Sequence, residues 1–287
     1  MTERAEPRLM GWSTSAAAAV LLWISRTVLA LLASYPLLLA VRASMMTAGP
    51  EGDAVLFQPG ALLLLELLRV GGPWLASATE LSLLLLGLAA IFELIPLAVA
   101  LDLLSAGDRP LLQRAASALR LFPRFLALGL ITLLAQAALL LAASLLGAAL
   151  KPMLASADER LQSLAPIALF SVGLLACGWF GGALDIARAT LVRSNLARGG
   201  ARAALAQAVD CLRQRPLRVL LGVYPSIAGS ALAVLAATWF LARFVPTQAT
   251  GRALALGFAA HQLAMLFAIV WRVRWLGTAL ELSAESD

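Results

Sequence analysis

Six long apolar runs, separated by shorter charged segments, limit this chain to a membrane architecture. A helix needs about 20 apolar residues to cross a bilayer core, and its backbone polar groups must be satisfied within the segment. The sequence therefore predicts an all-α, polytopic integral membrane bundle of six transmembrane helices, built as one domain over residues 1–287. The expected spans are residues 16–41, 81–104, 121–150, 164–184, 217–241 and 253–270.

The composition agrees with that of a membrane protein and also limits the classes of partner that we expect the chain to bind. Hydrophobic residues make up 61% of the chain and charged residues only 13%, against about half and a quarter in soluble domains. The net charge of +6 lies in the loops between the apolar runs. This placement favours anionic lipid headgroups as partners, with a membrane or cytoplasmic protein as a second possibility, and it argues against nucleic acid.

The distribution of basic residues predicts an orientation. With the N-terminus inside, the inner segments hold 15 of the 22 lysines and arginines, and the outer segments hold six. Basic residues accumulate on the cytoplasmic side of membrane proteins. We therefore expect both termini in the cytoplasm. The first run is too long for the core of a signal peptide, so we expect it to be an uncleaved helix.

One apolar segment is too short to cross. Residues 61–70 lie between Pro59-Gly60 and Gly71-Gly72-Pro73, and they contain Glu66 and Arg69 at i, i+3 spacing. Ten residues fall far below the length of a span. The segment is expected to form an outer interfacial or re-entrant helix.

An arginine-rich segment between the fourth and fifth spans is too charged to cross the membrane. It also carries apolar residues at helical spacing, with Leu205, Val209 and Leu212 on one face. We expect a cytoplasmic amphipathic elbow that binds anionic headgroups or docks an acidic protein, each arginine contributing about 1 kcal/mol at an anionic surface. The seven arginines are Arg188, Arg193, Arg198, Arg202, Arg213, Arg215 and Arg218.

The elbow belongs to an internal repeat in which residues 100–130 match residues 183–223. Leu119-Arg120-x-x-Pro123 recurs as Leu212-Arg213-x-x-Pro216, and each motif is followed by Leu-Gly five residues after the proline. Upstream, Ala100-Leu101-Asp102 recurs as Ala183-Leu184-Asp185. Both copies descend into the cytoplasm and return, so the repeat is parallel rather than inverted.

The first copy is expected to form a second amphipathic elbow before Pro123. Asp108 could cap this helix and Pro110 suits its first turn. Its apolar face would be formed by Leu112, Ala115, Leu119 and Phe122.

The second copy also carries a family resemblance. Asp185-Ile186-Ala187-Arg188, the arginine-rich elbow and Arg213-x-Arg215-Pro216 resemble bacterial six-helix membrane proteins of unassigned function. The segment is also similar to the membrane domain fused to some glycerophosphodiester phosphodiesterases. The resemblance covers about residues 81–241. It implies a helical bundle of unknown role in a bacterial cytoplasmic (inner) membrane. No activity carries over from the resemblance, because this sequence contains no phosphodiesterase catalytic domain.

Arg26 and Glu93 are ionisable residues inside predicted spans. Helical rise places Arg26 about 15 Å and Glu93 about 12 Å from the inner face. One hypothesis for Arg26 and Glu93 is an ion pair that only holds two helices together. The more specific functional hypothesis is a proton or substrate site. In a third possibility, Arg26 reaches the interface and Glu93 stays protonated.

Other candidate residues favour structural roles. Asp102 and Asp185 are expected to pair with elbow arginines, and Gln136 to bond between helices. His261 is expected to hydrogen-bond within the bundle. Trp271 and Trp275, interleaved with Arg272 and Arg274, would anchor the last span at the interface.

The chain carries no motif of a hydrolase or a nucleotide-binding enzyme, and neither Cys177 nor Cys211 has ligand-spaced partners. We therefore expect no catalytic residue, metal or cofactor. The leading hypothesis is a non-enzymatic scaffold or modulator that acts on lipids or membrane partners through its arginine-rich cytoplasmic face. The alternative is a small transporter or lipid-handling carrier with Arg26 and Glu93 at its site.

Overall fold

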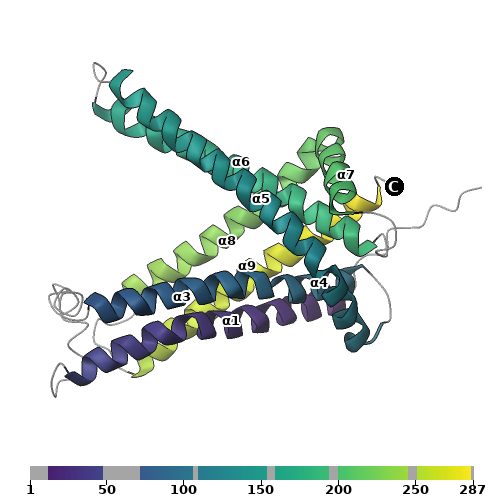
Figure 1. The fold of residues 1–287 in the computed structure, drawn as a ribbon. Coiled ribbons are helices and arrows are strands. Elements are labelled where there is room, and N and C mark those ends of the chain that lie inside the picture. The colour runs from purple at the N-terminus through teal and green to yellow at the C-terminus, as the bar shows by residue number, and fades with distance from the viewer. Residues whose placement is uncertain are drawn as a thin grey trace, which may run out of the picture. The chain divides into compact units, whose positions relative to one another are not determined.

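The computed structural model describes residues 12–47, 72–105, 109–153, 159–193, 200–244 and 251–285, and within these ranges every element is a helix (Figure 1). The predicted all-α fold is confirmed. The expected helix at 61–70, Asp108 and Arg198 lie outside the described residues. The helices are α1 (Trp12–Thr47), α3 (Gly72–Phe92), α4 (Leu94–Leu104), α5 (Leu111–Met153), α6 (Glu159–Arg193), α7 (Ala201–Gln214), α8 (Pro216–Phe244) and α9 (Gly251–Ala284).

Six segments of these helices are long and apolar enough to cross a membrane. Large apolar side chains such as Leu83, Leu84, Leu133 and Leu134 are more than half exposed on them, as expected of surfaces that face lipid. The fourth and sixth segments run further toward their C-terminal ends than the sequence suggested. The segments are Ser13–Ala40, Ala76–Leu104, Leu111–Leu150, Leu164–Arg193, Pro216–Phe240 and Ala255–Ala284.

The chain divides into two compact units. The first comprises Met1–Ala18, Ala98–Ala228 and Trp271–Asp287, and the second comprises Ala19–Leu97 and Gly229–Val270. The division falls inside α1, α4, α8 and α9. The single domain expected from the sequence stays a prediction.

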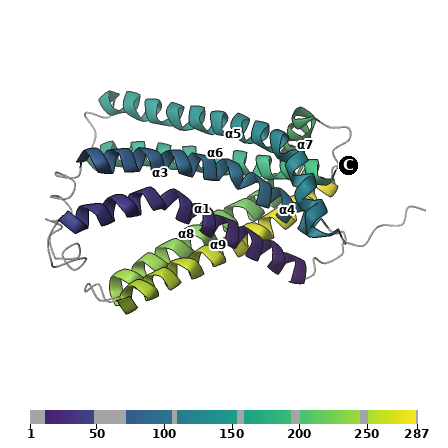
Figure 2. The ribbon, with the colours of Figure 1, turned by 60° about the horizontal axis from the view of Figure 1, so that its bottom comes forward.

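In the first unit, α5 and α6 lie side by side along most of their lengths (Figures 1 and 2). Small residues allow this approach, since a Cβ on Gly173 would lie 3.1 Å from the Cβ of Ala143. The Gln136 amide donates a hydrogen bond to the Cys177 carbonyl at 2.8 Å. Gln136 therefore bonds between helices, as the sequence predicted.

In the second unit, Pro96 explains why α3 and α4 are separate helices. A proline has no N–H, so the bond from residue 96 to the Phe92 carbonyl cannot form. The flanking bonds remain, with Glu93 N–H donating to the Ala89 carbonyl at 2.8 Å and Leu97 N–H donating to the Glu93 carbonyl at 3.1 Å. The interruption is thus confined to one turn, and Glu93 lies in it.

The first amphipathic segment differs from the expected separate elbow, because its residues form the first turns of the continuous helix α5. Pro123 lies inside this helix and does not end it. The expected apolar face is largely exposed, with Leu112 at 84% and Leu119 at 58%. The face that packs inward instead carries Arg114, Ala118, Leu121 and Phe125.

The second elbow forms the separate helix α7, as expected, but its packing face is shifted. Ala204, Ala208, Cys211 and Leu212 are buried, whereas Val209 is exposed. Small side chains on this face let α7 approach its neighbours closely. Two of the three predicted face residues, Leu205 and Val209, therefore border the packing face.

Candidate functional site

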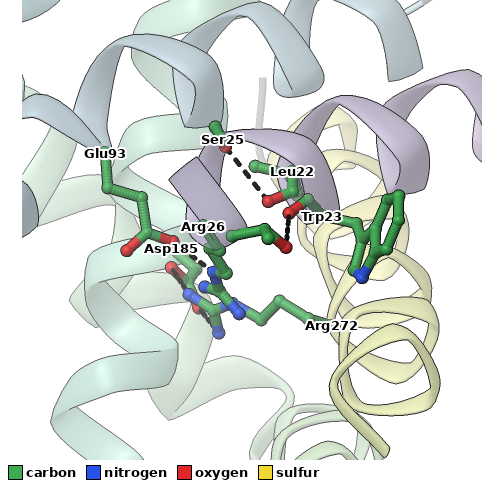
Figure 3. Close-up of polar contacts among 8 residues, drawn as sticks. Leu22, Trp23, Ser25, Arg26, Glu93, Asp185 and Arg272 are labelled. Atoms are coloured by element: carbon green, nitrogen blue, oxygen red, sulfur yellow. Dashed lines mark hydrogen bonds and ion pairs between the residues drawn. The ribbon is translucent and has the colours of Figure 1, made fainter. Parts of the chain in front are cut away.

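Asp185 of α6 lies at the centre of a buried polar cluster in the first unit. Its carboxylate is 1% exposed and accepts hydrogen bonds from Arg272 Nη2 at 2.7 Å and from the Trp275 indole N–H at 2.8 Å. Arg272 Nη1 lies 2.6 Å from the other carboxylate oxygen, so that the guanidinium holds both oxygens (Figure 3). This cluster, Asp185–Arg272–Trp275, joins the C-terminal part of α9 to α6.

Gly222 makes room for the Trp275 ring. A Cβ on Gly222 would lie 2.5 Å from two of its ring carbons, whereas one on Gly182 would make an ordinary contact of 3.6 Å with a third. Trp275 is 1% exposed. The expectation that Trp275 anchors the helix at the interface is therefore wrong, because the indole is enclosed between α6 and α8 and its N–H has a buried acceptor.

Arg188 also differs from the expected surface position. Its side chain is only 8% exposed, with Nη1 3.8 Å from an Asp185 oxygen and its guanidinium carbon 5.7 Å from the centre of the Phe125 ring. This distance is within the range of a cation–π interaction. Arg188 thus belongs to the interior of the bundle and is not placed to meet a lipid headgroup.

Asp102, which matches Asp185 in the repeat, pairs with arginines of the first amphipathic segment. Its carboxylate lies 3.8 Å from Arg109 and 3.8 Å from Arg114. The closer contact is to the main chain, since Arg114 Nη1 donates to the Asp102 carbonyl at 2.6 Å. The predicted pairing of Asp102 with these arginines is confirmed.

In the second unit, Arg26 Nε of α1 donates to a carboxylate oxygen of Glu93 (Figure 3). The two side chains are 33% and 29% exposed. Close by on α1, Trp23 Nε1 donates to the Gln262 side chain of α9 at 3.1 Å. The structure thus joins the two intramembrane charges that the sequence singled out.

His261 is not part of this polar contact. Its side chain is exposed, and Nδ1 lies 2.9 Å from the Gly257 carbonyl one turn earlier. The hydrogen bond accords with the expectation from the sequence, but the exposed His261 side chain does not pack inside the bundle.

The remaining described arginines of the elbow fall into two groups. Arg202 and Arg213 on α7 are exposed, and no described carboxylate forms an ion pair with either. Arg215 and Arg218, at the α7–α8 junction, both pair with Glu285 at the end of the described chain. Arg218 is still 61% exposed, and Arg193 is exposed at the end of α6. We call Arg202, Arg213 and Arg218 the α7 arginine surface.

An apolar cavity of about 480 Å³ lies beside this surface. α5 contributes Ala135, α6 contributes Phe180 and Ala183, and α7 contributes Leu205, Val209 and Arg213. Leu205 and Val209 of the apolar face predicted for the second elbow therefore line a cavity instead of the packed core, whereas Leu212 lines the cavity and is also buried. We call this space the α7 cavity.

A second cavity, of about 340 Å³, lies along the glycine-rich face of α6. Gln136, Ser226 and Arg272 are among its lining residues. Gln136 and Arg272 are already bonded to Cys177 and Asp185.

The contact made by the Cys211 thiol shows that α7 packs closely against its neighbours. Its thiol donates to the Leu282 carbonyl at 3.9 Å. Burial raises the pKa of the Cys211 thiol, and the nearby Arg215 opposes this shift. The thiol is therefore held in its neutral, unreactive form.

The described residues contain no group of three histidines, cysteines or acids close enough to hold a metal ion. The fold and these contacts define an all-α, multi-span membrane protein with a buried polar cluster around Asp185. Comparisons with protein-family models, with curated proteins and with solved structures found no match. The resemblance to the phosphodiesterase-linked membrane domain therefore stays a prediction.

Sequence reasoning missed the roles of Arg272 and Trp275. They are three residues apart, which places them on one face of a helix, and this spacing was the available signal. Their acceptor is 87 and 90 residues earlier in the chain, and nothing local indicated Asp185 as the partner.

Proposed function

We propose that this chain is a non-enzymatic protein of a bacterial cytoplasmic membrane, with both termini in the cytoplasm, that binds anionic lipids through the α7 arginine surface. Through these lipids it would act as a scaffold or modulator of other membrane components. The observation that carries the proposal is the pair Arg202 and Arg213, exposed on α7 without an ion-pair partner among the described carboxylates.

The packing of α7 supports the proposal. Ala204, Ala208 and Cys211 hold one face of the helix against the bundle, so that Arg202 and Arg213 are held on the outside. Fixed cations at a membrane surface attract anionic headgroups, with about 1 kcal/mol for each arginine. A helix held in this way adds orientation, because the backbone that carries the two arginines needs no further ordering when they bind.

The carrier hypothesis has less support. It would use Arg26 and Glu93 as a site, and these two groups neutralise each other directly. A buried or half-buried pair of this kind is satisfied without a ligand, and it accounts for both residues as a lock between α1 and the α3–α4 junction.

Native mass spectrometry of protein gently extracted from its own membrane tests the proposal. Wild type should retain anionic lipids, and the R202Q/R213Q double variant should lose most of them. The matched control is R243Q, which removes an exposed arginine at the other end of α8. Equal retention by the double variant and wild type would refute the proposal. A retained acidic protein that depends on the same arginines would instead favour a docking surface.

A further inference from the structure

We infer that the α7 cavity binds one acyl chain of an anionic lipid, and that the Arg213 guanidinium holds the headgroup of that lipid. The inference rests on the proposed function, because it assigns a specific site to a lipid of the class that the α7 arginine surface attracts. Three features of the first unit support it: the volume and lining of the cavity, the state of Arg213, and the helices from which the walls come.

The first feature is the chemistry of the lining. The volume of about 480 Å³ is within the range of about 300–1,000 Å³ that small-molecule sites occupy. Among the described lining residues, Arg213 alone is charged. The Thr132 hydroxyl is already used, since it donates to the Leu128 carbonyl at 2.9 Å. Such walls suit a hydrocarbon chain and offer little to a polar ligand.

The second feature is the exposure of Arg213 and its lack of an ion-pair partner among the described residues. It lines the cavity from α7 and is exposed. Asp210 lies one turn earlier on the same helix, yet no ion pair joins the two among the described contacts. An open guanidinium next to an apolar space matches an amphiphile with a negative head. Arginine binds phosphate well, because two of its N–H groups can donate to it in parallel.

The third feature is the origin of the walls. Ala135, Phe180 and Ala183 belong to helices long and apolar enough to span the membrane, whereas Leu205, Val209 and Arg213 belong to the short amphipathic α7. An acyl chain between these elements would remain at the depth of the bilayer. Its headgroup would lie at the surface, where Arg213 is expected.

Photo-cross-linking tests the inference. The probe is phosphatidylglycerol with a diazirine in one acyl chain, and the comparison probe is phosphatidylcholine with the same chain. We expect cross-links of phosphatidylglycerol to concentrate at the lining residues Ile131, Thr132 and Ala135 of α5 and Trp179, Phe180 and Ala183 of α6. R213Q should lower their yield about five-fold, the factor that corresponds to one surface cation, and R213K should restore most of it. R202Q should change this yield little.

A second pair of variants tests the cavity itself. A135F fills the space from α5, and A137F adds the same side chain on the opposite face of that helix, where Ala137 is exposed. We expect A135F to remove the concentrated cross-links and A137F to preserve them. The folded state of each variant is checked by its thermal unfolding in detergent.

Some outcomes would overturn the inference and leave the proposed function intact. Cross-links that spread evenly over exposed α5 residues such as Leu133 and Leu134 would do so, as would equal losses in R202Q and R213Q. In those cases, the arginine surface would still bind headgroups, without a chain in the cavity. If R202Q/R213Q retains its anionic lipids, the proposed function fails and the assignment of the headgroup to Arg213 fails with it.

Discussion

Asp102 and Asp185 occupy matching positions in the repeat but are held in different ways. The Asp185 carboxylate receives a two-pronged contact from Arg272 and an indole hydrogen bond, all at 2.8 Å or less. The Asp102 carboxylate has arginines at 3.8 Å, and its strongest contact uses the main-chain carbonyl. One site is a closed polar core, and the other is a loose pairing at a helix end.

The difference shows how an arginine-rich segment can hold both buried and surface charges. The second copy of the repeat contacts α9, a helix outside the repeat that supplies Arg272 and Trp275. These partners satisfy Asp185, together with the neighbouring Arg188. The arginines further along, Arg202 and Arg213, are then free of any described acid and remain available at the surface.

The largest expected effect comes from removing each aspartate. D185A leaves the Arg272 guanidinium and the Trp275 N–H without their acceptor, and breaking a buried pair costs about 3–5 kcal/mol. D102A keeps the hydrogen bond from Arg114 to the main chain and removes only carboxylate contacts of 3.8 Å, so it should destabilise the protein less than D185A does. Unfolding titrations in mixed micelles measure both. Equal losses would show that the two sites are not different in kind.

Gly129 and Gly222 occupy matching positions in the repeat, and their substitution by alanine should give a smaller difference in stability. G222A places a methyl group 2.5 Å from the Trp275 ring, and overpacking of this kind costs about 1–3 kcal/mol. G129A meets only Arg188 Nη2, at 3.5 Å, which is ordinary contact. It should be neutral or slightly stabilising, since alanine favours helix more than glycine does. Melting temperatures of the two variants measure the contrast, and a stable G222A would mean that Trp275 can move aside.

Neutralising Glu285 should change lipid binding more than stability. E285Q removes the exposed partner of Arg215 and Arg218, and exposed pairs contribute about 0–1 kcal/mol. The two arginines should then retain more anionic lipid in native mass spectra. Unchanged or reduced retention would argue against headgroup binding at the α7–α8 junction.

The reactivity of Cys211 should change without any change in stability. Because burial raises the pKa of this thiol, the fraction present as thiolate at mildly alkaline pH is small. We expect slow alkylation by a water-soluble maleimide, accelerating as the pH rises toward the raised pKa and in detergents that detach α7. Fast alkylation in the folded protein would show that the thiol is not enclosed.

Much of the fold could be predicted from the sequence, because a span requires a long apolar run whatever its neighbours are. The contact between Arg26 and Glu93 followed from their similar depths in the membrane. The packing faces of the elbows did not follow. In water an apolar stripe marks the buried face, but beside a bilayer residues such as Leu112 and Leu119 can face lipid, so the pattern no longer identifies the core.

The partners of Asp185 could not be predicted for a different reason. The composition of residues 271–275 is typical of an interface anchor. This interpretation applied equally to Trp271, Arg272, Arg274 and Trp275. Only the tertiary arrangement selects Trp275 for burial, because Gly222 leaves space for its ring.

The most direct test of the account compares Arg213 with Arg120, its counterpart in the repeat. Both are exposed arginines, but only Arg213 is among the residues that line the α7 cavity. Phosphatidylglycerol is titrated into detergent-solubilised R213Q, R120Q and wild type, and bound lipid is counted by native mass spectrometry. We expect about five-fold weaker binding in R213Q and nearly unchanged binding in R120Q. Equal weakening in both variants would contradict it, because the two regions would then bind lipid by net charge alone.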